Sequence, residues 1–184
     1  SKQEVLELFV ATAKAAKQEG VMAIEKKAND VADPFIRSTM TMVADGFNAD
    51  FIYNVVDAEI KQMEERHRSG AQIFAQCGMY APTLGVLGAV IGLIAALGNL
   101  SDIDQLGHSI AAAFVATLLG IFTGYVCWHP FANKLKQLNA EEVELKRMVL
   151  EGALALQEGA SSIAIESRLQ AYIPLAERKS MRDA

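Results

Sequence analysis

Apolar and polar positions divide the sequence into three zones. In the first zone, apolar residues recur at helical spacing and predict three short amphipathic helices. The first covers residues 2–19 and stops at Gly20, and the second covers 21–28. The third begins at Pro34, which suits the first turn of a helix, and ends near Asp45 and Gly46.

The middle zone contains two long apolar runs. Helical spacing of apolar residues starts at Ala49, and a polar turn at 64–68 leads into the first run, so one long helix could carry the chain from a soluble region into a membrane. The runs at about 78–100 and 106–131 each have the roughly 20 residues that cross a ~30 Å hydrocarbon core. The short connection between them predicts a transmembrane hairpin.

Charged residues indicate on which side of the membrane the flanks of this hairpin lie. Residues 69–101 and 105–133 contain no Asp, Glu, Lys or Arg, whereas Arg66, Arg68, Lys134 and Lys136 flank the hairpin. Basic residues favour the cytoplasmic side, so the loop at 101–105 is expected outside. A charged helix is expected at 132–158 and a last short one at 161–172.

These patterns predict an all-α membrane protein with cytoplasmic helices on both sides of a transmembrane hairpin. The expected domains are a cytoplasmic helical region at 1–68, the hairpin at 69–133 and cytoplasmic helices at 134–184. Because the sequence starts at Ser1 without an initiator methionine or a signal peptide, we expect a fragment, a processed product or a sequence whose earlier residues are missing.

Composition excludes several classes of function. A formal net charge of −5 without a Lys/Arg-rich face argues against nucleic-acid binding. The two cysteines and three histidines form no metal motif, and a disulfide framework is not expected. With no catalytic triad, phosphate loop or paired catalytic carboxylates, we expect neither an enzyme nor a cofactor.

Small residues mark one face of each span. They are Gly85, Gly88 and Gly92 in the first, and Ala112, Ala116, Gly120 and Gly124 at every fourth place in the second. Such faces permit close helix packing, since lipid gives no hydrophobic drive to association. They serve either the packing of this hairpin alone or a seam against other subunits.

Three further groups of residues have both a structural and a functional interpretation. The hydroxyls of Thr83, Thr117 and Thr123 either bond to their own helix or line a wet path. Pro82 and Pro130, near the cytoplasmic ends of the spans, are either simple kinks or hinges. Charged residues gather around the turn at Gly20, and Lys17 and Glu25 are two of them. A charge run of this kind is usually only a solvated face. Neither span has a carboxylate or lysine, so the chain cannot relay protons by itself.

Several motifs together resemble the MotA family of bacterial flagellar stator proteins, and they cover nearly the whole chain. They are MEERH at 63–67, YAPTLGVLGAVIGLI at 80–94, LGH at 106–108, ATLLGI at 116–121, HPFANKL at 129–135, VLEGAL at 149–154 and the tail at 167–174. The family has two further membrane helices before the position of Ser1, and these are absent from the sequence.

The resemblance implies a multi-pass protein of the bacterial inner membrane, with five subunits in a ring around two copies of MotB. The MotB membrane helix carries the ion-binding aspartate. Pro82 and Pro130 match the family's two coupling prolines, and Thr117 matches the threonine facing the ion path. Lys17 and Glu25 fall where the family contacts the rotor's switch protein, although Lys17 replaces the commoner arginine.

The same resemblance indicates whether the protein conducts protons or sodium. Sodium needs oxygen ligands in place of its water, and sodium-driven members commonly have a threonine in the third helix beside the one in the fourth. Here the third-helix position is Ala89, which favours protons. Two alternatives stay open at this point: an energiser of the ExbB/TolQ type, and a soluble scaffold in which the apolar runs are buried core helices.

Overall fold

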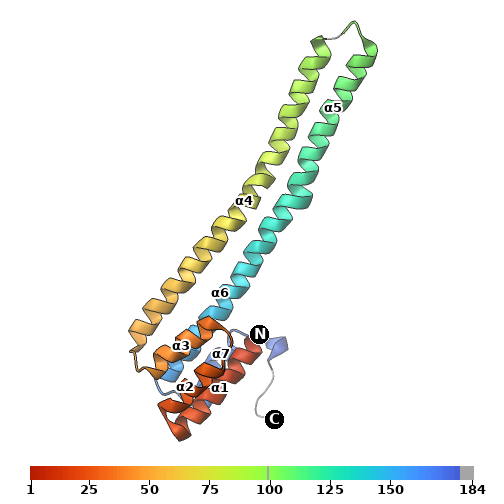
Figure 1. Ribbon diagram of the computed structural model, residues 1–184. Coiled ribbons are helices and arrows are strands. Elements are labelled where there is room, and N and C mark those ends of the chain that lie inside the picture. Colours follow the sequence, from red (N-terminus) through yellow and green to blue (C-terminus); the bar gives the residue numbers. More distant parts are fainter. Residues whose placement is uncertain (99, 179–184) are drawn as a thin grey trace. The chain divides into compact units, whose positions relative to one another are not determined.

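The computed structural model describes residues 1–98 and 100–178, and within them every regular element is helical (Figure 1). The chain divides into two compact units. The first unit combines Ser1–Glu64 with the residues from Ala140 onward, and the hairpin unit is Glu65–Asn139. The expectations for residue 99, in the first predicted span, and for 179–184, in the carboxyl-terminal region, lie outside the described residues.

The first unit begins with three short helices, α1 (Lys2–Glu19), α2 (Val21–Asp30) and α3 (Pro34–Ala44). Ser1 and Glu4 form a capping box at the start of α1, and the Asp33 carboxylate accepts two backbone hydrogen bonds at the start of α3. The predicted helix at 2–19 is confirmed. The second helix extends two residues past its predicted end.

Three other helices complete this unit. They are the first part of α4 (Ala49–Gly98), the last part of α6 (His129–Gln157) and α7 (Ser162–Gln170), followed by a short 3-10 turn at Leu175–Glu177. The last helix is shorter than the predicted 161–172, because Ser161 lies outside it and caps it through its side chain.

An apolar core joins these helices. Phe9 of α1 is fully buried, and its ring lies against Gly152 of α6, where a Cβ atom would come within 2.8 Å of the ring. Its fully buried companions come from four other helices: Met40, Ile52, Ile60, Met148, Ile165 and Leu169. Burial of each such side chain contributes about 1.5–3 kcal/mol.

Three buried polar side chains of the first unit, Thr12, Thr39 and Asp57, have partners. Thr12 and Thr39 donate to carbonyl oxygens one turn back in their own helices, at 2.7 and 2.8 Å. The nearly buried carboxylate of Asp57 lies 2.6 Å from the ammonium of Lys61. The hydrogen bond from Lys61 to Asp57, together with the negative charge of Asp57, raises the pKa of Lys61. These bonds satisfy the buried side chains of Thr12, Thr39 and Asp57, whereas the buried Oε1 of Gln3 in α1 has no hydrogen-bond partner.

The hairpin unit consists of the second part of α4 running antiparallel to α5 (Ile103–Phe122), a π-helical turn (Thr123–Trp128) and the start of α6 (Figure 1). The expected long helix from Ala49 is confirmed, but the polar turn predicted at 64–68 is wrong. That segment lacks glycine and proline, and Arg68 pairs with Glu65 at 2.5 Å along the helix surface, so its charges lie on a continuous helix.

Both long helices have a stretch with a mean hydropathy of 2.0, long enough to cross a membrane. Only 11% of the stretch in α4 and 6% of that after Ile103 are buried within the chain. A core helix of a soluble protein would be mostly buried, so the soluble-scaffold alternative does not fit. These apolar surfaces require lipid or other subunits around them.

Candidate functional site

Small residues bring the two helices of the hairpin into backbone contact. A Cβ atom added at Gly120 would lie 2.5 Å from the carbonyl oxygen of Ala81 and 2.8 Å from Cα of Gly85. At Gly85 it would lie 2.9 Å from the carbonyl oxygen of Ala116. We call this contact the seam, formed by Gly85, Gly88, Gly92, Ala113, Ala116, Gly120 and Gly124. Even the methyl group of alanine has no room at its centre, between Gly85 and Gly120, unless the helices move apart.

Further along the seam, a proline meets a glycine. Pro82 lies inside α4, and its Cγ and Cδ atoms come within 2.9 Å of where a Cβ of Gly124 would be. Gly124 belongs to the π-helical turn, and the backbone N–H of His129 donates to its carbonyl oxygen, five residues back. The two predicted hinge residues, Pro82 and Pro130, therefore both lie beside this turn.

The π turn has a local cause. A proline ring clashes with the carbonyl oxygen four residues before it in a regular α-helix and donates no hydrogen bond. Pro130 follows the turn directly, and the carbonyl that it would meet is that of Val126, inside the turn. The wider π spacing is a recognised way to insert one residue into a helix. The sequence predicted one unbroken span at 106–131, so the π turn is a correction.

Hydroxyl groups of the hairpin bond to their own helices. Thr83 donates to the carbonyl of Met79 at 3.3 Å, Thr117 to that of Ala113 at 3.1 Å, and Thr123 to that of Leu119 at 2.8 Å. Thr117 is half-buried, as is Ala89, whereas Thr83 is exposed. Each hydroxyl oxygen still has lone pairs that can accept a hydrogen bond.

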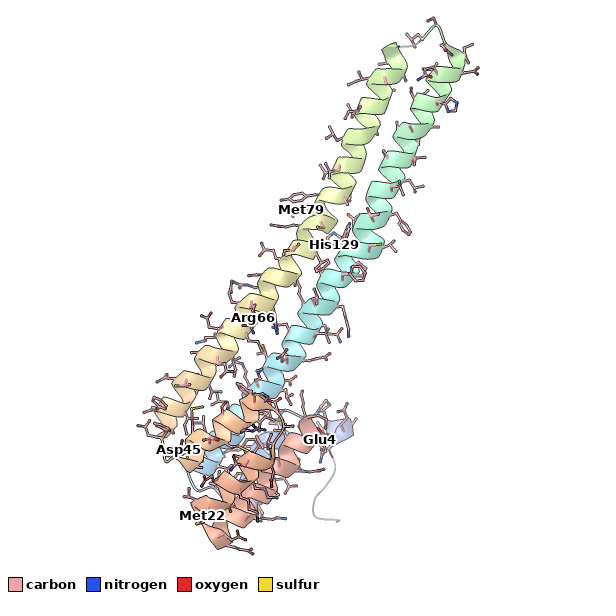
Figure 2. All side chains as sticks on the ribbon, viewed as in Figure 1. Glu4, Met22, Asp45, Arg66, Met79 and His129 are labelled. Atoms are coloured by element: carbon pink, nitrogen blue, oxygen red, sulfur yellow. The ribbon has the colours of Figure 1, made fainter. Side chains whose placement is uncertain are left out.

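One side chain beside the seam was not singled out from the sequence. The imidazole of His129 lies over the backbone of Gly78, so that a Cβ there would come within 3.0 Å of three ring atoms. The ring of Tyr125 is 5.4 Å away between centroids. Figure 2 shows His129 facing α4 at the level of Met79. A histidine is a titratable group, and the prediction that the spans cannot relay protons rested on carboxylates and lysines alone.

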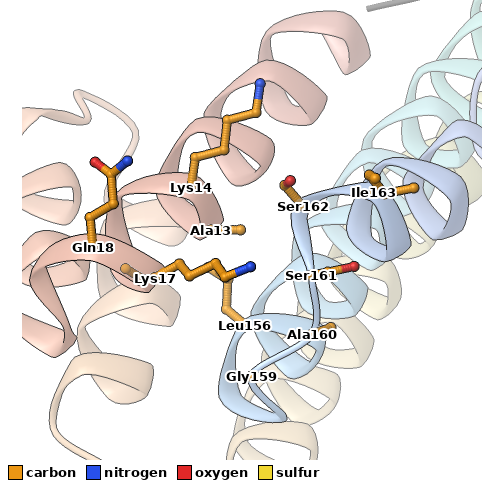
Figure 3. A pocket seen from close by; sticks show the side chains of 11 residues that line it. Ala13, Lys14, Lys17, Gln18, Leu156, Gly159, Ala160, Ser161, Ser162 and Ile163 are labelled. Carbon is orange, nitrogen blue, oxygen red and sulfur yellow. The ribbon is translucent and has the colours of Figure 1, made fainter. Parts of the chain in front are cut away.

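The two predicted rotor-contact residues lie in the first unit. Lys17 is exposed in the last turn of α1, and Glu25 is exposed on α2. With Lys14, Lys17 lines a cavity of about 530 Å³ whose far wall includes Ser161 and Ser162 (Figure 3). No acidic residue lines this cavity, and Glu25 is not part of it.

These features define a class of protein. Two apolar helices of membrane-spanning length, exposed along most of their surface and joined through a seam of small residues, are typical of the subunits of a membrane channel or transporter. The chain belongs to the MotA/TolQ/ExbB proton channel family, whose model matches residues 27–148. The chain is therefore a membrane protein, as the resemblance in its motifs implied.

Within this family, the chain is similar to proteins named Motility protein A. The chain is 51% identical to Motility protein A of Bacillus subtilis over 96% of its own length and 65% of the relative's. It is 32% identical to Motility protein A of Borreliella burgdorferi over 100% of its length and 71% of the relative's. The chain thus spans about two thirds of the length of these relatives.

Solved structures agree. A chain of the flagellar MotAB stator complex from Bacillus subtilis superposes with a TM-score of 0.88 at 50% identity, covering 97% of this chain and 70% of that one. A chain of C. jejuni MotAB superposes with a TM-score of 0.92 at 28% identity, covering 98% and 71%. The MotA-like helical fold predicted from the motifs is confirmed.

Proposed function

We propose that this chain forms the ion-conducting part of a bacterial flagellar stator subunit, which couples ion flow to torque on the rotor. One observation carries the proposal most strongly. The hairpin has an apolar, unburied exterior and a close-packed seam, yet neither apolar stretch contains a carboxylate or a lysine. A channel helix pair of this kind needs a partner that supplies the charged ion-binding group.

The names of the relatives support that partner. Two of the similar structures are MotAB stator complexes, so the partner proposed here is a MotB-like protein with a single membrane helix that carries an aspartate. Several copies of the subunit, five in our proposal, surround it. The seam holds the two helices of each copy together, and the exposed apolar faces give each copy surfaces toward lipid, toward the partner and toward its neighbours.

Orientation and ion are part of the same proposal. The charge pattern favours the inner membrane with the loop at 101–105 outside and the first unit in the cytoplasm. Thr117, Thr83 and Ala89 are proposed for the ion path. Because Ala89 has a methyl group and no oxygen ligand, we favour protons over sodium. The protein would act as a conduit and not as an enzyme.

Contact with the rotor is assigned to Lys17 and Glu25, which are both exposed. Pro82 and Pro130 are assigned to coupling, since both lie at the π turn. The domain boundaries proposed from the sequence, at about 68 and 133, follow from the same charge pattern.

The test is complementation. The full-length protein and its MotB-like partner are expressed in a bacterium that lacks its own stators, and swimming speed is measured against external sodium and with a protonophore. We expect motility that is independent of sodium and abolished by the protonophore. Swimming that rises with sodium and survives the protonophore would contradict the proton assignment. Restored outer-membrane energisation without motility would favour the ExbB/TolQ-type alternative.

A further inference from the structure

We propose that His129 exchanges protons with the ion path, and that the π turn before it aims its imidazole toward α4. This inference rests on the proposed proton conduction and adds to it a residue of this chain that handles the proton. It starts from the position of the ring over Gly78, in a hairpin whose apolar stretches contain no Asp, Glu, Lys or Arg.

The geometry of the turn explains why the imidazole faces α4. Gly124 faces Gly78, since a Cβ at Gly124 would lie 3.0 Å from the carbonyl oxygen of Gly78. In an α-helix, a residue five positions later points about 140° away from the first. In the π turn the N–H of His129 bonds to the carbonyl of Gly124, so the two residues lie one turn apart on nearly the same face. Both therefore face Gly78.

Gly78 is the other half of this arrangement. A Cβ atom there would come within 3.0 Å of Cγ, Cδ2 and Cε1 of the imidazole, which is closer than ordinary contact. Glycine thus leaves the ring room to lie flat against the backbone of α4. The position of the His129 imidazole thus depends on two features from different helices: the residue inserted at the π turn, and the absence of a side chain at Gly78.

Imidazole suits proton exchange because its ordinary titration falls between about pH 5 and 8. In the proposed step, one ring nitrogen takes a proton from water in the path, the ring becomes positively charged, and a ring nitrogen then returns a proton to water on the cytoplasmic side. No proton is gained or lost overall. Titratable groups within the segment around the ring are Tyr125 and Cys127 in the π turn and Cys77 beside Gly78.

The experiment uses the full-length protein with its MotB-like partner in proteoliposomes, where an internal pH dye reports proton flux across a series of external pH values. The wild type should show a pH-dependent step in this flux. His129→Gln should remove this step and lower the flux by about 10²-fold, at the lower end of what a positioned proton-transfer group contributes.

Two further variants separate chemistry from packing. His129→Phe keeps an aromatic ring of similar size and should also lose the step. Gly78→Ala keeps the histidine but displaces its ring, and should shift or weaken the step. Gly107→Ala is the matched control, because a Cβ there meets nothing within 4 Å, and it should leave the pH profile unchanged.

The outcomes distinguish this inference from the proposed function. If the wild type conducts and His129→Gln or His129→Phe keeps the same pH step, the role of His129 is refuted while conduction stands. If the wild-type complex conducts no protons at any pH, the proposed function itself is refuted and the inference falls with it.

Discussion

Replacement of Gly120 by alanine tests how closely the hairpin is packed. The new methyl group would lie 2.5 Å from the carbonyl oxygen of Ala81 and 2.8 Å from Cα of Gly85, where ordinary contact begins at 3.4 Å. Both neighbours are backbone atoms, which cannot move away by changing a rotamer as a side chain can. The helices must therefore move apart by about 0.6–0.9 Å, which forfeits a quarter to a half of each attractive contact at the seam. Overpacking of this kind costs about 1–3 kcal/mol.

A matched control removes the intrinsic effect of alanine on a helix. Alanine is favoured over glycine by about 1 kcal/mol in helix interiors, and Gly107→Ala in α5 gains this without meeting another atom within 4 Å. Gly120→Ala should thus be less stable than Gly107→Ala by about 1–3 kcal/mol. Gly88→Ala should fall between them, because its methyl group would meet only the side-chain Cβ of Ala116, at 3.0 Å.

Unfolding by SDS in mixed micelles measures these differences. The chain has a single tryptophan, Trp128, in the π turn of the hairpin, so its fluorescence reports on the hairpin unit. If Gly120→Ala unfolds at the same SDS fraction as Gly107→Ala, the helices do not approach as closely as the seam requires, and the packing argument fails.

Four other outcomes are expected in the first unit. Phe9→Ala should destabilise it by about 3–5 kcal/mol, measured by chemical denaturation under circular dichroism; a loss below 1 kcal/mol would contradict the burial of the ring. Lys17→Glu and Glu25→Lys should each reduce torque in tethered cells while changing stability by less than about 0.5 kcal/mol, and unchanged torque would assign both residues to a solvated face. Burial raises the pKa of Tyr172 above its usual 10.0, so its neutral form is favoured in the folded state. The stability it contributes should be present below pH 10 and lost as the pH rises further, and Tyr172→Phe should lose less stability there than the wild type; equal losses would refute this.

Helix positions were largely predictable because their signals are local. Apolar spacing and Gly20 predict the extent of α1, and Pro34 marks the first turn of α3. The polar segment at 64–68 misled the prediction, since a run of charges was read as a turn. A turn needs residues that leave the helical region, usually glycine, proline or asparagine, and this segment has none of them.

The candidate site was predictable only in part. Small residues at every fourth place indicate a packing face, and the structure has Gly85 and Gly120 in backbone contact. Hydroxyls gave a weaker signal, because nothing in the sequence decides whether Thr117 bonds to its own helix or lines a path. In the structure it donates to the carbonyl of Ala113, which still leaves its oxygen able to accept a hydrogen bond.

The π turn explains why His129 was missed. A helical reading of the sequence assigns faces by steps of 100° per residue, and by that count His129 points about 140° from Gly124 and away from α4. One inserted residue changes the count for everything that follows it. Pro130 is the only local sign of the insertion, and a proline near the end of a span equally permits a simple kink. The face that His129 presents is thus set by a backbone hydrogen bond to Gly124, which periodicity cannot show.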